Sequence, residues 1–312
     1  MQTPVLFLVF NRPELTQQVF DVIRQVKPTQ LYIAADGPRV ANPVDALLCA
    51  QVRTIVNEID WHCEVKTLFR DENLGCKTAV SRAIDWFFDH VEEGIILEDD
   101  CLPDRTFFPY CTELLSRYRD DDSVMSVSGS NLLGKPWKYD KQSYFFAHGG
   151  IWGWATWKRA WKLYDEAMKD WPRSETKKVI RENIQTKGWY DFYLPMFEAS
   201  HNGTLDTWDI QWFYTILINN GLAINPAVNL VRNIGFASGT HLNSDDNAIA
   251  RLESRAIAFP LVAPTQEKAD IAYLKLIYQV VTAKASMQKF SPGRVIRYLL
   301  RAITHKKPTP QS

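Results

Sequence analysis

Apolar runs alternate with amphipathic segments over the first 130 residues. Val5 to Phe10 is a continuous apolar run, which is typical of a strand buried on both faces of a parallel sheet. From Leu15 to Val26 apolar residues recur at helical spacing, after a proline that suits the first turn of a helix. The alternation continues and predicts strands at 31–35, 65–69 and 94–97, with helices between them. This order predicts an α/β fold, a mostly parallel, Rossmann-like sheet flanked by helices.

The alternation weakens beyond Ser123 to Gly129, which predicts one more strand. A tryptophan-rich segment, two charged helices and a helix over Trp208 to Asn220 follow, without a linker rich in Pro, Gly or Ser. We therefore expect one continuous body over residues 1–265, made of a first half (1–130) and a second half (131–265). A helical basic tail is expected over residues 266–312.

Charge is balanced overall but not along the chain. The 312 residues include 36 Lys and Arg and 36 Asp and Glu, which argues against nucleic-acid binding. After Asp270 there are eight basic residues and no acidic one. Arg294, Arg297 and Arg301 share one side of a predicted helix. Such a helix either lies on an anionic membrane surface or packs on the body with its arginines in water.

The cysteines and the N-terminus indicate the compartment. Five cysteines without a CxxC pair suggest reduced thiols. The first ten residues have no cationic start, and no run approaches the roughly 18 apolar residues of a membrane span. We expect a cytoplasmic protein, either soluble or peripherally attached to the inner membrane face.

Polar side chains follow each of the first four predicted strands. In chain order these are Asn11-Arg12, Asp36-Gly37, the segment Arg70 to Gly75, and Glu98-Asp99-Asp100. Ligands of such sheets bind outside the carboxyl ends of the strands. We therefore expect the four segments to converge on one ligand.

Glu98, Asp99 and Asp100, here called the acidic triad, place three adjacent carboxylates at the end of a buried strand. Their mutual repulsion favours a bound cation or raised pKa values. Mn²⁺ or Mg²⁺, held by one or two carboxylates and substrate phosphates, fits a motif this short. The alternative is a solvated acidic turn.

The order of these segments resembles the GT-A fold of nucleotide-sugar-dependent glycosyltransferases. The acidic triad is similar to the EDD motif of the N-acetylglucosaminyltransferase I family, and the chain resembles bacterial relatives of that group from about Pro4 to His241. Some of these relatives are described as hemolytic-protein-like or family 2-like glycosyltransferases. The resemblance implies that Asp100 binds the metal and that Glu98 and Asp99 lie near the donor. It also implies a nucleotide site formed by Phe10, Asn11, Arg12, Asp36, Arg70, Asn73, Gly75 and Lys77.

The second half carries the acceptor and catalytic predictions. Trp152, Trp154 and Trp208 are expected to contact sugar or acceptor, since indole faces stack on sugar rings, whereas Trp157 and Trp161 are expected in the core. By resemblance Asp209 is the general base and Asp206 the fallback, although either could cap a helix. His241 would complete the metal site. The Ala237–Gly239 run departs from the relatives' pattern, which has a glycine and often an acidic residue there.

These observations predict a metal-dependent, inverting glycosyltransferase. It would transfer a sugar from a nucleotide diphosphate sugar, most readily a UDP-sugar, to a hydroxyl of a glycan or lipid-linked acceptor in surface polysaccharide or lipopolysaccharide synthesis. Retention of configuration stays open. One alternative is a sugar nucleotidyltransferase, whose Gly-rich loop after the first strand is missing from Phe10 to Pro13. The other is a carbohydrate-binding protein, which would leave the acidic triad without a purpose.

Overall fold

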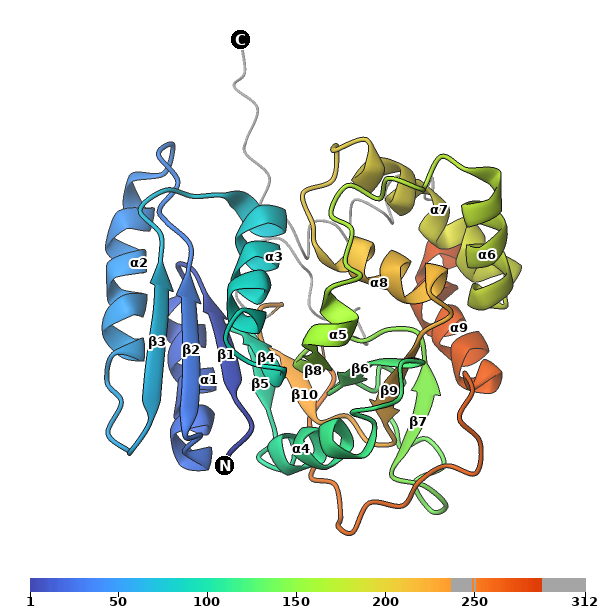
Figure 1. The fold of residues 1–312 in the computed structure, drawn as a ribbon, viewed down its shortest axis with the longest axis horizontal. Coiled ribbons are helices and arrows are strands. Elements are labelled where there is room, and N and C mark those ends of the chain that lie inside the picture. Colours follow the sequence, from blue (N-terminus) through green and yellow to red (C-terminus); the bar gives the residue numbers. More distant parts are fainter. Residues whose placement is uncertain (237–248, 250, 288–312) are drawn as a thin grey trace.

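A mixed sheet forms the centre of the computed structural model, which describes residues 1–236, 249 and 251–287 (Figure 1). Eight strands follow the order β3-β2-β1-β4-β8-β6-β9-β7, and β5 and β10 form a separate antiparallel pair. The first four strands are mutually parallel, and β8 and β7 run antiparallel to their neighbours. The predicted α/β class with a mostly parallel sheet is confirmed.

The first half has the strand and helix order expected from the sequence. Its strands are β1 (Val5–Val9), β2 (Gln30–Ala35), β3 (Glu64–Phe69) and β4 (Glu93–Glu98). The helices between them are α1 (Pro13–Val26), α2 (Pro43–Val56) and α3 (Gly75–Phe88). Each of the first two helices begins with a proline, whose fixed φ and missing N–H suit the first turn.

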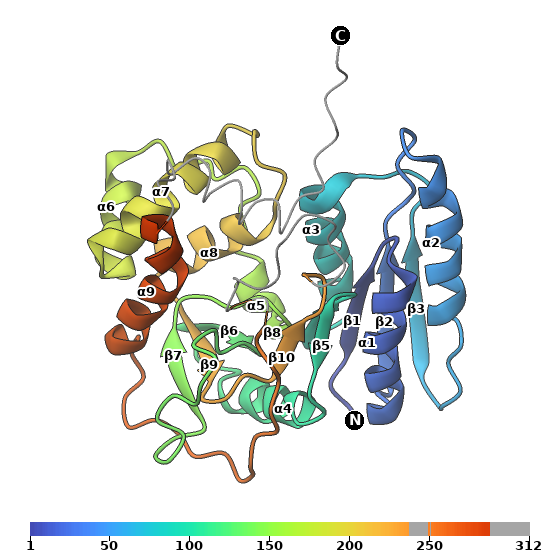
Figure 2. The same cartoon turned by 180° about the vertical axis from the view of Figure 1, so that it is seen from behind.

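The alternate residues of β1 face two different parts of the core. Val5, Phe7 and Val9 pack with residues of α1 and α2, whereas Leu6 and Leu8 pack with residues of α3. Figure 2 presents the side of the sheet that α1 covers. Burial on both faces explains why this strand has a continuous apolar sequence.

The second half contains short strands and several helices. The strands are β5 (Cys101–Pro103), β6 (Val124–Ser128), β7 (Tyr144–Ala147), β8 (Trp154–Trp157), β9 (Leu222–Pro226) and β10 (Val231–Asn233). The helices are α4 (Phe107–Arg117), α5 (Lys158–Trp161), α6 (Ser174–Ile184), α7 (Lys187–His201), α8 (Asp209–Ile218) and α9 (Ile271–Met287). A further apolar cluster joins residues of α6, α7, α8 and α9.

The tryptophan-rich segment supplies a central strand. β8 lies between β4 and β6, and its four residues are all buried. Trp154 and Trp157 face opposite sides of the sheet and belong to different apolar clusters. The core position expected for Trp157 is therefore confirmed, but its i, i+4 spacing to Trp161 does not mean that both lie on one helix. Trp157 ends a strand and Trp161 ends α5.

The first part of the predicted tail packs on the body. Tyr273 and Leu274 of α9 are buried, and the indole N–H of Trp189 donates to the carbonyl of Leu274 at 2.8 Å. The basic helix predicted around Arg294 to Arg301 lies outside the described residues. Over the part of the chain that the structure describes, no helix combines the length and the apolar character that a bilayer crossing requires.

Candidate functional site

The strand ends meet at one edge of the sheet as predicted. Because β3, β2, β1 and β4 are adjacent and parallel, their carboxyl ends share the edge that is uppermost in Figure 1. Leu8 of β1 pairs with Glu98 of β4, so the residues that follow these two strands lie next to each other. This places Arg12 beside the acidic triad.

The guanidinium of Arg12 joins two carboxylates of the triad. Its Nη1 lies 2.9 Å from Asp100 Oδ2, and Nε lies 3.3 Å from Asp99 Oδ2. Nη2 donates to the second oxygen of Asp99. Asp99 is only 2% exposed, so its charge depends on these partners for compensation.

Burial and mutual repulsion shift the pKa values of this group. Burial raises the pKa of Glu98 to about 8, with a further contribution from the charge of Asp100. The pKa of Asp99 is also raised by burial, and Arg12 opposes that shift. Burial alone would lower the pKa of Arg12, but the charges of Asp99 and Asp100 outweigh it and raise that pKa. The carboxylates of the triad therefore repel one another, and the positive charge of Arg12 partly offsets that repulsion.

The described residues do not fit the predicted divalent cation in this arrangement. Both oxygens of Asp99 and one of Asp100 accept from Arg12. Within residues 1–236, 249 and 251–287, no group of three or more His, Cys, Asp or Glu side chains could hold a metal ion. The predicted second ligand, His241, lies outside those residues. The cation that compensates the triad here is a guanidinium.

Asp36 binds the loop that leads into α3. Its carboxylate accepts from Asn73 Nδ2 at 2.8 Å and from the Leu74 amide at 3.1 Å. The structure thus brings Asp36, Asn73 and Gly75 together, as expected for one nucleotide site. Gly75 has φ +80°, a left-handed conformation that favours glycine. Both carboxylate oxygens of Asp36, which is expected in the nucleotide site, accept from this loop.

Asp45 is a residue of this edge that the sequence did not single out. It is fully buried and accepts from Asn11 at 2.8 Å, from Asn42 at 2.8 Å and from Arg39 Nε at 2.5 Å. Arg39 also lies over the ring of Phe10, 5.4 Å from its centroid. We call Asp45 with Asn11, Arg39 and Asn42 the Asp45 cluster. An acid in the first turn of a helix is common, so nothing in the sequence distinguishes Asp45 from such an acid.

Two other cations of the predicted nucleotide site, Arg70 and Lys77, have acidic neighbours outside the triad. Arg70 is partly buried, which lowers its pKa, and the charge of Asp36 acts in the opposite direction. Lys77 Nζ lies 3.6 Å from Glu166. Arg70 thus stays with Asp36, whereas Lys77 points toward a residue of the second half.

Asp206 caps a helix of the first half. Its carboxylate accepts from the backbone amides of Cys76 at 3.2 Å and Lys77 at 3.0 Å, in the first turn of α3. Carboxylates are stabilised at this position by free amides and the helix dipole. Asp206, the fallback base, therefore makes a structural contact between the two halves.

Asp209 of the second half acts electrostatically on Glu98 of the acidic triad. It is the first residue of α8, and the hydroxyl of Thr207 donates to it. Burial raises its pKa, and its charge contributes to the raised pKa of Glu98. The Cys76 thiol, whose pKa is raised first by burial, also feels the charges of Glu98 and Asp209. These couplings place Asp209 and Glu98 in one partly buried cluster.

The three candidate acceptor tryptophans lie in different surroundings. Trp154 and Trp208 are buried, and their rings stack with centroids 5.5 Å apart. Trp152 is partly exposed and contacts Phe236 edge-on, with centroids 5.6 Å apart. Trp152 alone of the three retains surface for a ligand, and this weakens the alternative of a carbohydrate-binding protein that uses all three.

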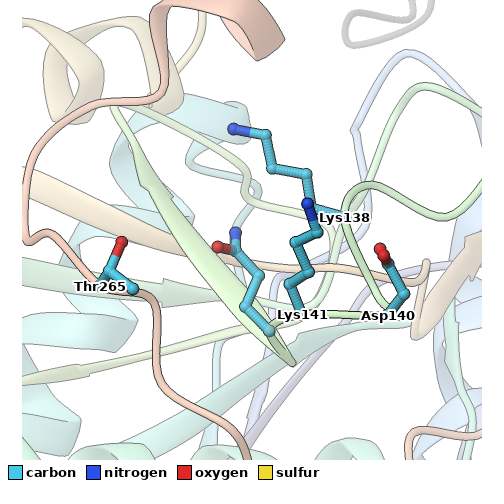
Figure 3. Close-up of a pocket in the computed structure, with 5 residues that line it drawn as sticks. Lys138, Asp140, Lys141 and Thr265 are labelled. Atoms are coloured by element: carbon cyan, nitrogen blue, oxygen red, sulfur yellow. The ribbon is translucent and has the colours of Figure 1, made fainter.

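A separate hollow lies beside β7, at the end of the sheet opposite β3 (Figure 3). It has a volume of about 380 Å³ and is lined by Lys138, Asp140, Lys141, Gln142 and Thr265. Lys138 also pairs with Asp270 at 2.6 Å. No predicted site residue lines this hollow, so the strand-end edge remains the candidate site.

Comparisons with known proteins assign no family. No protein-family model matches the sequence, and no curated protein matches it. HddC from Yersinia pseudotuberculosis is matched with TM-score 0.32 and 10% identity, over 55% of this chain and 81% of that chain. A CMP:2-keto-3-deoxy-manno-octonic acid synthetase complexed with CTP is matched with TM-score 0.33 and 12% identity, over 55% and 82%.

A third solved structure, 4-diphosphocytidyl-2C-methyl-D-erythritol synthase from Anaerococcus prevotii, is matched with TM-score 0.32 and 7% identity, over 55% of this chain and 78% of that chain. Likenesses this weak carry no argument about the activity of this chain. None of the three names is that of a glycosyltransferase. Neither a family model nor a curated protein supports the glycosyltransferase family that the sequence suggests.

Proposed function

We propose that this chain is a transferase that uses a nucleotide diphosphate sugar and moves the sugar to a hydroxyl of a glycan or lipid-linked acceptor. The observation that supports it is the position of Asp209. This carboxylate comes from the second half and lies in the same partly buried cluster as Glu98 at the strand-end edge. A donor site and a candidate base thus share one cluster, as group transfer to a hydroxyl requires.

The nucleotide would occupy the ends of β1, β2 and β3. Phe10 offers an aromatic face. The Arg39 guanidinium lies over the Phe10 ring and is held in place by Asp45. Asp36 and Asn73 fix the loop beside this site through their mutual hydrogen bond, and Arg70 would supply charge to phosphate. Cation and directional polar partners are what a nucleoside diphosphate needs.

Asp209 would accept the proton of the acceptor hydroxyl. The Thr207 hydroxyl donates to one carboxylate oxygen, and the backbone amides of Asp209 and Ile210 also favour the ionised carboxylate. Burial raises the pKa of Asp209, and a raised pKa makes a carboxylate a better base near neutral pH. Glu98 would contact the donor sugar. The divalent cation implied by the resemblance enters no step here, because the described residues do not fit it as they stand.

Ligand-dependent thermal stability tests this proposal. The chain is heated with UDP-, GDP-, dTDP- and CMP-sugars, with Mn²⁺ and with a chelator. One nucleotide diphosphate class should raise the melting temperature, since a ligand that binds only the folded state stabilises it. Turnover is then followed with that donor and simple sugar acceptors. Stabilisation by free sugars alone would contradict the proposal.

A sugar nucleotidyltransferase is the second candidate. Arginines follow three adjacent strands of the edge, Arg12, Arg39 and Arg70, and a nucleoside triphosphate is the ligand whose charge would use them most fully. The missing Gly-rich loop between Phe10 and Pro13 argues against it. Stabilisation by a nucleoside triphosphate, with pyrophosphate release from a sugar phosphate, would favour this candidate.

A further inference from the structure

The helix α8 carries one narrow, partly exposed stripe. All residues from Ile210 to Leu217 are buried except Phe213. Phe213 and Asp209 are both partly exposed, and they are four positions apart. Side chains at this spacing lie one above the other on a helix, about 6 Å apart along its axis. The candidate base and an aromatic ring therefore share one surface of α8.

Tyr193 of α7 extends this surface beside Phe213. The centroids of the two rings are 4.4 Å apart, with the ring planes tilted by 41°. The buried rings of Trp189 and Phe197 also contact Tyr193, with centroids 5.4 Å and 5.9 Å from its own. Tyr193 itself is partly exposed. Its ring is thus fixed by packing while part of it remains accessible.

The hydroxyl of Tyr193 is available for a hydrogen bond. No residue that the structure describes forms a hydrogen bond with it. Burial raises the pKa of Tyr193 and the charge of Asp209 raises it further, so the hydroxyl stays protonated and can donate. The Tyr214 hydroxyl on α8 also lacks a partner among the described residues, but it is sealed in the core. The Tyr193 hydroxyl is not sealed in this way.

The loop between β7 and β8 borders the Phe213 ring with backbone. A Cβ at Gly149 would lie 3.6 Å from Phe213 Cδ2, so a side chain at this position would contact the ring that glycine leaves uncovered. The Gly149 carbonyl accepts from Asn225 Nδ2 at 2.9 Å, which fixes the loop at this point. Phe213 is therefore enclosed by Tyr193 and Gly149 without being covered by a third side chain from this loop position.

A pyranose ring matches this combination of groups. The C–H face of a sugar packs against aromatic rings, and its hydroxyls need a small number of well-placed polar partners. Phe213 and Tyr193 supply the ring faces, and the Tyr193 hydroxyl supplies a donor. Asp209 lies about one helical turn from Phe213, a distance similar to the width of one sugar ring, so a hydroxyl of the same sugar can reach the carboxylate.

We propose that Tyr193 and Phe213 hold the acceptor sugar against Asp209. Both are positioning residues, which bind the pyranose that carries the acceptor hydroxyl and take no part in the bond changes. The acceptor is therefore a glycan with a pyranose, and not a lipid alcohol, at the reacting position. This inference rests on the proposed function, because it names the acceptor class of the same site.

Acceptor kinetics test the positioning role. The full chain is assayed with its donor and with methyl pyranosides of glucose, galactose, mannose and N-acetylglucosamine. Tyr193→Ala should raise the acceptor KM about fivefold, the value of one aromatic contact, and leave donor affinity and the hydrolysis of donor by water unchanged. Tyr193→Phe keeps the ring and should raise the KM less. The control Tyr214→Phe removes a hydroxyl that is sealed in the core and should leave both substrates' constants unchanged.

Binding to otherwise unaltered protein provides a second measurement, which covers the case in which Tyr193→Ala does not fold. The chain is labelled with 3-fluorotyrosine, and the fluorine resonances of Tyr193 and Tyr214 are assigned by their loss in the two Phe variants. The four pyranosides are titrated in the absence and in the presence of UDP. At least one of them should shift the Tyr193 resonance in step with binding and leave that of Tyr214 in place.

Three results would overturn the proposal: an acceptor KM that Tyr193→Ala leaves unchanged, equal shifts of the Tyr193 and Tyr214 resonances, or no response of Tyr193 to any pyranoside. These failures are separable from failure of the proposed function. A pyranoside response at Tyr193 in a chain that takes up no nucleotide sugar would refute only the transferase. Sugar transfer with an acceptor KM that is indifferent to Tyr193 would refute only this inference.

Discussion

Asp45 and Asp209 are both aspartates of the first turn of a helix, yet their surroundings are opposite. Asp45 is fully buried and accepts from Asn11, Arg39 and Asn42, so an arginine and two amides satisfy one carboxylate. Asp209 accepts from the Thr207 hydroxyl and from the backbone amides of Asp209 and Ile210, but burial outweighs these neutral donors and raises its pKa. Arg39, in contrast, lowers the pKa of Asp45. A carboxylate paired with an arginine contributes to stability, whereas a carboxylate with neutral donors and a raised pKa is better suited to accept a proton.

The largest expected effect is the loss of sugar-transfer activity when Asp209 is replaced. Asp209→Asn should lower the rate of sugar transfer about 10²- to 10⁴-fold, the usual contribution of a general base, and leave donor affinity unchanged. Turnover and donor titration by calorimetry measure the two effects separately. Asp206→Asn serves as the matched variant, since Asp206 is engaged at α3. Activity retained in Asp209→Asn and lost in Asp206→Asn would reverse the two roles.

The next largest effect is expected on stability. Asp45→Asn should lower the free energy of unfolding by about 2–3 kcal/mol, because it leaves Arg39 without its buried counter-charge. Arg39 is 33% exposed, which keeps the loss below that of a fully buried pair. Urea unfolding measures it. Asp21→Asn, at an exposed ion pair with Arg24, should change stability by less than about 1 kcal/mol; equal losses at the two positions would contradict the role of the Asp45 cluster.

A smaller loss is expected at the contact between the halves. Asp206→Ala should cost about 1 kcal/mol, the usual value of a helix cap, and speed amide hydrogen exchange at Cys76 and Lys77. Those two amides donate to Asp206. Asp71→Ala, at an exposed position nearby, provides the control. Unchanged exchange in Asp206→Ala would contradict the capping role.

The smallest expected effect is on the pH dependence of stability, to which Asp45 and Asp209 contribute with opposite signs. Asp45 has a lowered pKa, so its stabilisation is present above the unfolded value of about 3.9 and is lost as pH falls through the folded pKa. Asp209 has a raised pKa, so ionising it costs stability at pH 7, and that cost disappears as pH falls through its folded pKa. Asp209→Asn should therefore raise stability at pH 7, by about 0.5–1 kcal/mol, and not at pH 3. A stability gain that persists at pH 3 would refute this assignment.

Much of the first half was predictable from local pattern. The apolar run at Val5 and the helical spacing from Leu15 to Val26 correspond to β1 and α1. The convergence of Arg12, Asp36 and the acidic triad followed from one rule about parallel strands. These features depend on residues close in sequence or on a regular topology.

The remaining features depend on partners distant in sequence. Trp154 was expected to contact sugar, but antiparallel pairing with Ile96 and Ser128 buries it in the sheet. The partner of Asp99 and Asp100 is Arg12, 87 and 88 positions away. Spacing alone cannot distinguish a guanidinium from a metal ion as the compensating charge, because either would relieve the same repulsion.

The central position of β8 also constrains the order of assembly. β4 pairs with β1 on one side and with residues 154–157 on the other, so a nascent chain that ends near residue 130 has an uncovered β4 edge. Unpaired edges of this kind recruit other chains, and pairings distant in sequence form slowly. On the ribosome, the first four strands would therefore need protection until the WATW segment has emerged.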